Sequence, residues 1–186
     1  MITKKMQDAI NTQINAELCS AYLYLSMSMD AETKGLKGVA NWMYVQWLEE
    51  QEHARILENY MNAQGAKVEL LPITEVPKTW KNTLEMFRDA LYHEKEVTEN
   101  INKLISTAWH EKDFATISRL EWFITEQVEE EDSVNYIIDQ LELAGDEKLG
   151  LYSIDQKLAE RWLDDDREKV RFRFNTTMQI LRQMII

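Results

Sequence analysis

The chain has 186 residues, of which 45% are apolar and 29% charged, a profile typical of one folded domain with a sizeable core and not of a disordered chain. Its net charge of −12 disfavours nucleic-acid binding, which needs a basic face, and suits a protein that attracts cations. Only five glycines and two prolines interrupt a sequence rich in helix-forming residues, so we expect an all-α fold.

The start of the chain mixes charged and apolar residues through position 17, which is not the pattern of a secretory signal peptide. No apolar run reaches the ~18 residues that a membrane span needs. The single cysteine, Cys19, excludes an intramolecular disulfide and suits a reducing compartment, where we expect it to be a buried, inert thiol. We therefore expect a soluble, cytoplasmic protein with no membrane or nucleic-acid partner.

Two long helices open the chain, over about residues 4–34 and from there to Gly65, and the Gly35-Leu36-Lys37-Gly38 turn between them makes them antiparallel neighbours. Residues 66–79, with Pro72 and Pro77, then form a connection of unusual length. Fourteen extended residues cover up to ~46–50 Å, whereas a helix of ~27 residues is ~40 Å long. The connection can therefore cross the whole bundle, which would make the second and third helices parallel.

A third helix is predicted over about residues 80–110, and a fourth follows the short 111–113 connection and ends near Gly145. A short fifth helix, over about 146–161, carries Leu149, Leu151, Ile154 and Leu158, which we expect to find partners in symmetric contacts between copies of the chain. From 162 to 186 the composition changes, so we divide the chain into a domain at 1–161 and a C-terminal extension at 162–186 that we expect to point inward.

Each of the four long helices has a glutamate within its apolar face. At steps of three and four residues the faces read Ile10, Ile14, Glu17, Ala21, Tyr24; Val39, Met43, Gln46, Glu50, His53, Leu57, Tyr60; Phe87, Ala90, Glu94, Val97, Ile101, Leu104, Ala108; and Leu120, Phe123, Gln127, Glu130, Val134, Ile137, Leu141. Burying an isolated carboxylate is prohibitive, so four that converge in one bundle must protonate, pair with cations or bind metal. Two divalent ions would balance four glutamates.

The second helix also places His53 three residues after Glu50, on the same face and one turn apart. Such a pair is common on solvated helix faces, but here both members lie on the apolar face. Oxygen ligands with a single nitrogen suit iron or manganese, and a glutamate that bridges two ions would hold them close together.

Several neighbouring residues have two readings. Tyr24 and Gln127 lie on the same faces, where each either makes an ordinary core hydrogen bond or supports the metal site. Glu49, Glu126 and Glu129 flank the central ligands by one position, and they either bind a third cation or belong to a solvated charged face. The position of His93 indicates that its side chain does not bind metal. The position of Trp122 indicates that its ring packs near the metal centre.

Over residues 1–161 the sequence resembles the ferritins, and specifically the bacterial non-haem type. The matching motifs are Glu17, Tyr24, Glu49-Glu50-x-x-His53, His93-Glu94, Glu126-Gln127-x-Glu129-Glu130 and Tyr152-Ser153-Ile154-Asp155. The resemblance implies a ferritin-like four-helix bundle with a long crossover and a short fifth helix. Bacterioferritins carry a methionine where Gln51 stands here and a second Glu-x-x-His motif in the fourth helix, so haem is not expected.

By the same resemblance, Glu17, Glu50 and His53 hold one iron, with Glu50 bridging, and Glu94 and Glu130 hold the second, supported by Gln127. Glu49, Glu126 and Glu129 would supply a third site. The implied function is iron storage: Fe(II) is oxidised by dioxygen or peroxide and deposited as a ferric mineral inside a 24-subunit shell. Two alternatives stay open, namely a dinuclear carboxylate oxygenase or peroxidase acting on an organic substrate, and a helical scaffold that binds no iron.

Overall fold

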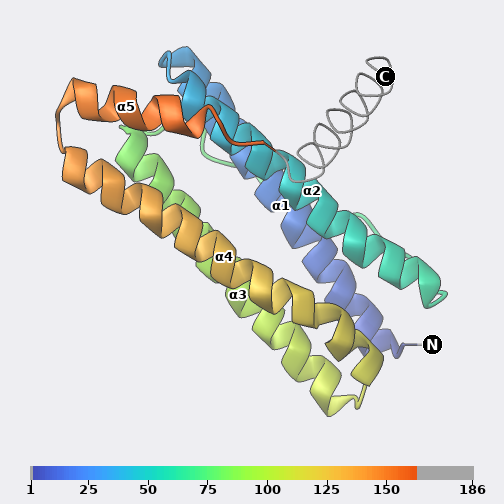
Figure 1. Cartoon of the computed structure of the whole chain (residues 1–186). Coiled ribbons are helices and arrows are strands. Elements are labelled where there is room, and N and C mark those ends of the chain that lie inside the picture. The colour runs from blue at the N-terminus through green and yellow to red at the C-terminus, as the bar shows by residue number, and fades with distance from the viewer. Residues whose placement is uncertain (1, 163–186) are drawn as a thin grey trace, which may run out of the picture.

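The computed structural model describes residues 2–162 and is all-α over that range, as predicted. Its helices are α1 (Lys4–Thr33), α2 (Lys37–Ala63), α3 (Thr83–His110), α4 (Phe114–Ala144) and α5 (Lys148–Leu158). Figure 1 shows α1 to α4 as a bundle in which α2 and α3 run in the same direction, while α5 lies across one end. None of the described helices is long and apolar enough to cross a membrane. The predicted extension lies outside the described residues, apart from Trp162.

The predicted bounds of two helices were wrong. The third helix begins at Thr83 and not near residue 80, because the Asn82 side chain caps it by accepting a hydrogen bond from the Glu85 amide (2.8 Å), while Glu85 accepts one from the Lys81 amide (2.6 Å). The fifth helix is shorter than predicted at both ends, since it spans Lys148–Leu158 and not 146–161.

The long crossover from α2 to α3 is fastened to α1 along most of its length. Side chains of α1 satisfy backbone groups of the crossover at distances of 2.6–3.1 Å, in the pairs Asn11 with Glu69, Asn15 with Leu71, Ser26 with Pro77 and Asp30 with Trp80. An extended segment has no hydrogen bonds of its own, so these side chains replace the partners that a helix or a sheet would provide. The crossover therefore has a defined path, and the predicted parallel arrangement of α2 and α3 is confirmed (Figure 1).

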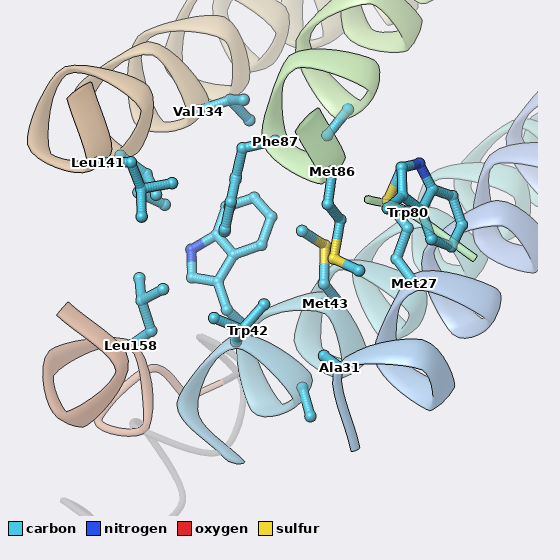
Figure 2. Close-up of a cluster of buried hydrophobic side chains, with 14 of the residues drawn as sticks. Met27, Ala31, Trp42, Met43, Trp80, Met86, Phe87, Val134, Leu141 and Leu158 are labelled. Carbon is cyan, nitrogen blue, oxygen red and sulfur yellow. The ribbon is translucent and has the colours of Figure 1, made fainter. Parts of the chain in front are cut away.

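Every residue predicted on the four apolar faces is buried. The apolar members form two clusters. One, shown in Figure 2, contains Trp42, Phe87 and Leu141 near α5, and the other contains Ile10, Leu57 and Phe123 near the opposite end. On each long helix the glutamate lies in sequence between the two clusters. The core is thus divided by a polar layer.

Helix α5 packs tightly against the start of α2. The Asp155 side chain accepts a hydrogen bond from the Val39 amide (2.9 Å), one of the donors that the first turn of a helix leaves unpaired. A Cβ atom on Gly38 would lie 1.6 Å from the Asp155 carbonyl oxygen. Ile154 and Leu158 are buried within the chain, so the expectation that they need partners in another copy was wrong, whereas Leu149 is 80% exposed.

The close contact at Gly38 predicts that Gly38→Ala pushes α5 away from α2. The added Cβ atom clashes with backbone and not with a flexible side chain, so the two helices must move apart to remove the clash. We expect the free energy of unfolding to fall by about 1–3 kcal/mol. Thermal unfolding checks the expected loss. Lys37→Ala, a change at the exposed neighbouring position, is the matched control and should change stability by no more than about 0.5 kcal/mol. Equal melting temperatures for the two variants would contradict the prediction.

Candidate metal centre

The four predicted glutamates occupy the polar layer between the two apolar clusters. Glu17, Glu50, Glu94 and Glu130 come from four different helices, and each is at most 5% exposed. His53 joins them at 4% exposure. Helical periodicity explains the arrangement, because each acidic residue continues the apolar face of its own helix and is carried into the core by the residues around it.

The ligand atoms of this layer lie close enough to share a cation. Glu17, Glu50 and His53 each offer one ligand atom within 4.8 Å of the others. A second group, formed by His53, Glu126 and Glu130, meets the same limit. His53 Nδ1 lies 3.5 Å from Glu50 Oε2. His53 thus belongs to both groups of carboxylates, and it could bind a cation in either one.

Neutral donors orient these carboxylates. Gln13 Nε2 donates to Glu17 Oε1 (2.9 Å) and Gln46 Nε2 donates to Glu130 Oε2 (2.9 Å). Glu94 receives a hydrogen bond from the Tyr24 hydroxyl and another from Gln127 Nε2, the latter at 3.2 Å. Amide and phenol donors fix the direction of a carboxylate without cancelling its charge.

Three buried oxygen atoms of this layer have no hydrogen-bond partner among the described residues: Glu17 Oε2, Gln46 Oε1 and Glu50 Oε2. An unsatisfied buried acceptor is costly, and oxygens that lack a donor are suited to coordinate a cation. With the imidazole of His53, they form a donor set of oxygen and one nitrogen, which fits iron or manganese.

Burial shifts the ionisation of the whole layer. It raises the pKa of Glu17 and Glu94, and it raises the pKa of Glu50 well above its ordinary value, where the charges of Glu94, Glu17 and Glu130 add to the effect. Burial, together with the charge of Glu94, raises the pKa of Glu130 to about 7. Desolvation and the charge of Glu94 also hold the pKa of Tyr24 well above its ordinary value. Without a cation, the glutamates of the layer therefore hold their protons to a higher pH than exposed glutamates do.

The structure agrees with the predictions for Trp122 and His93 and corrects the one for Cys19. Trp122 packs edge-on against the His53 ring, with centroids 5.4 Å apart, as predicted. His93 Nε2 lies 2.7 Å from Ser20 Oγ and belongs to neither ligand group. Cys19 is only half-buried, and not buried as predicted, because it lies one position away from the buried Ser20 on the helix.

The three flanking glutamates are not gathered into one group. Glu126 belongs to the group with His53 and Glu130, Glu129 is exposed, and Glu49 accepts a hydrogen bond from Arg161. Neither ligand group found among the described residues contains Glu49 or Glu129. A third cation held by all three glutamates stays a prediction.

The site roles of three residues were missed at the sequence level. Gln13 lies four positions before its acceptor Glu17 on the same helix face, so a search for polar partners one turn away would have found it. Gln46 was predicted on the buried face of the second helix, but its acceptor is Glu130 of α4, and spacing along one helix does not predict a contact between helices. Arg161 contacts Glu49 across 112 residues of sequence, and no local pattern points to that contact.

Comparison with known proteins agrees with the geometry. The ferritin-like domain family matches residues 7–144. The "Bacterial non-heme ferritin" of Bacteroides fragilis is 41% identical over 161 residues, covering 87% of this chain and 100% of the relative, and that of Staphylococcus aureus is 35% identical over 166 residues, covering 89% and 100%. A crystal structure of an open-pore ferritin from the archaeon Archaeoglobus fulgidus superposes with a TM-score of 0.86 at 44% identity, covering 87% of this chain and 100% of the other. The chain belongs to the ferritin family.

The raised carboxyl pKa values predict that the metal-free protein loses stability as the pH rises. Glu130 illustrates the sign: its pKa is about 7 when folded and 4.5 ordinarily, so its contribution is complete below about pH 4.5 and is lost as the pH passes 7. For Glu130 alone the change amounts to about 3 kcal/mol. Thermal unfolding of chelator-treated protein between about pH 5 and pH 8 should show a falling melting temperature.

Glu130→Gln is the matched control for this measurement, because it removes one titrating group while keeping the shape of the side chain. Its melting temperature should depend less steeply on pH than that of the wild type. A wild-type melting temperature that rises over this interval would refute the assignment of protonated carboxyls to the metal-free layer.

Proposed function

We propose that this ferritin oxidises Fe(II) at the buried carboxylate layer and stores the product as a ferric mineral. The observation that carries the proposal is the set of three buried oxygens that have no hydrogen-bond partner within residues 2–162, in a layer to which four helices each bring a glutamate. Such a layer is costly as a purely structural feature, and divalent cations offset its charge. That cost disfavours a helical scaffold without iron.

In this proposal Glu17, Glu50 and His53 bind one ferrous ion, and Glu94 and Glu130 bind a second, with Glu50 bridging. The spacing of the first three ligand atoms, within 4.8 Å of one another, supports the first assignment. The mutual electrostatic influence of Glu50, Glu94 and Glu130 supports a location of the second ion beside the first. The weaker third site, at Glu49, Glu126 and Glu129, remains part of the proposal.

Two ferrous ions together supply the two electrons that reduce dioxygen to peroxide, or peroxide to water. The chain contributes position and charge to this step. Carboxylates stabilise the ferric product more than the ferrous substrate, because the product has the higher charge. The hydrogen bonds that Tyr24 and Gln127 donate to Glu94 hold that carboxylate in one orientation, and the protons retained by the metal-free layer leave as the ions bind.

The groove that reaches His53 offers cations an acidic approach to the site. It has a volume of about 1030 Å³, and its lining includes Glu49, Glu52, Glu58 and Glu126. Leu18, Leu48, Ile56 and Trp122 also line it, so its support for iron entry comes from the four carboxylates, which concentrate cations near His53.

We further propose that the chain assembles into a cytoplasmic shell of 24 copies. A single chain leaves large apolar side chains exposed, among them Tyr22, Met29 and Ile73, which line a groove of about 740 Å³ where α1 meets the crossover. Patches of this kind mark contact surfaces between proteins, and here a second copy of the chain is the proposed occupant.

The proposed centre predicts the outcome of Glu50→Ala combined with His53→Ala. The double variant removes two ligands of the first ion, so rapid oxidation of Fe(II) under air should fall at least about 100-fold. Stopped-flow absorbance of the ferric product measures the rate, and circular dichroism checks the fold. Asn62→Ala, at an exposed position on the same helix and outside the groove that reaches His53, is the control and should keep the wild-type rate. An unchanged rate in the double variant would place the oxidation elsewhere.

The proposed shell predicts a particle far larger than a monomer or dimer in sedimentation velocity at physiological salt. Met29→Glu with Ile73→Glu should release smaller species, because burying two unpaired charges at the contact is costly. Met29→Leu with Ile73→Val keeps both positions apolar and should assemble like the wild type. Sedimentation of the wild type as a monomer or dimer would favour the oxygenase alternative.

A further inference from the structure

Thr98 and Glu131 each lie one helical turn beyond a residue of the metal centre. On α3, Thr98 follows Glu94 by four positions, and on α4, Glu131 follows Gln127 by four positions. Both are half-buried, and with Gln127 they line a groove of about 490 Å³ between α3 and α4. Neither ligand group found within residues 2–162 contains Thr98 or Glu131.

A row of hydrogen bonds connects these four side chains. The Thr98 hydroxyl donates to Glu131 Oε1 at 2.6 Å, a distance typical of a hydroxyl bound to a carboxylate. Gln127 Nε2 donates to Glu94 Oε2 and to the Glu94 carbonyl oxygen, both at 3.2 Å, and more weakly to Thr98 Oγ1 at 3.4 Å. The row therefore runs from a half-buried carboxylate at the groove to a fully buried carboxylate in the metal layer.

The direction of each bond follows from the hydrogen atoms that each group can donate. A carboxylate only accepts hydrogen bonds, so Glu131 takes the single hydroxyl proton of Thr98. Thr98 then presents only lone pairs to Gln127, and lone pairs attract the NH₂ group of the amide and repel its oxygen. The NH₂ group is thus held toward Thr98 and Glu94. A flipped amide would place its oxygen against two acceptors.

We propose that Thr98 and Glu131 are positioning residues for the second metal ion, because they fix the amide of Gln127 and, through it, the Glu94 carboxylate. The inference rests on the proposed function, in which Glu94 and Glu130 bind that ion. Thr98 and Glu131 are not ligands in this arrangement, since both act through Gln127. Hydrogen-bond partners behind a metal ligand typically change affinity or activity by about 10–100-fold.

Anaerobic calorimetric titration of the full-length protein with Fe(II) tests the inference. Thr98→Val keeps the shape of the side chain and removes the hydroxyl group, so Gln127 loses an acceptor and Glu131 loses a donor. The second ion should bind at least about tenfold more weakly, while the first ion keeps its wild-type affinity. Thr98→Ser retains the hydroxyl group and should bind the second ion like the wild type.

Thr107→Val is the matched control. It makes the same change on the same helix, but the Thr107 hydroxyl donates to the Lys103 carbonyl oxygen, so both ions should bind as in the wild type. Glu131→Met removes the acceptor of the Thr98 proton and should also weaken the second ion, so it takes over the test if Thr98→Val fails to fold. The two changes combined should have little more effect than either alone, because both act through Gln127.

Wild-type affinity for both ions in Thr98→Val would overturn the inference and leave the proposed function intact, and the same result in Glu131→Met would do so where it takes over the test. An equal loss of both ions in either variant would also overturn the inference, because it would indicate general damage to the bundle. So would a Thr98→Ser variant that binds the second ion no more tightly than Thr98→Val does. A wild type that binds fewer than two ions would instead overturn the proposed function, and the inference with it.

Discussion

The burial of four carboxylates in one layer is the constraint on which the rest of this structure depends. Two apolar clusters exclude water from either side of the layer, and this exclusion raises the pKa of its glutamates. Inside a protein of low polarity such charges repel one another strongly. The donors supplied by Gln13, Gln46 and Gln127 are neutral, so they orient the carboxylates and leave the negative charge to be balanced by a metal.

The peripheral elements differ from this layer in how their charges are balanced. Asparagine side chains of α1 satisfy the backbone of the crossover near its start, and the charged pair of Asp30 and Lys34 binds the backbone of Trp80 at its end. The α5 end uses a full positive charge, Arg161, to neutralise Glu49. Neutral donors thus orient the carboxylates of the central layer, while Arg161 lies at the edge of the layer, where its charge also counteracts the rise in the pKa of Glu130.

Helical periodicity was the most informative signal in the sequence. It predicted every buried face and the glutamate on each, because one turn of a helix relates neighbours that are three or four residues apart. The two prolines and the length of residues 66–79 predicted the long crossover. Periodicity did not predict how the side chains of adjacent helices meet: Ile154 and Leu158 find partners within the chain, and Arg161 reaches Glu49 from a distant part of the sequence. Such contacts depend on tertiary packing, which periodicity does not describe.

The polar layer also separates the two apolar halves of the bundle, and at its level the helices are joined by hydrogen bonds between side chains. A ligand that binds only the folded state stabilises it by mass action, by about 2.7 kcal/mol at a concentration 100 times its dissociation constant. Iron in this position joins the two halves, so an empty subunit opens locally more often than a loaded one. The lifetime of each subunit is thereby linked to the cargo that it holds.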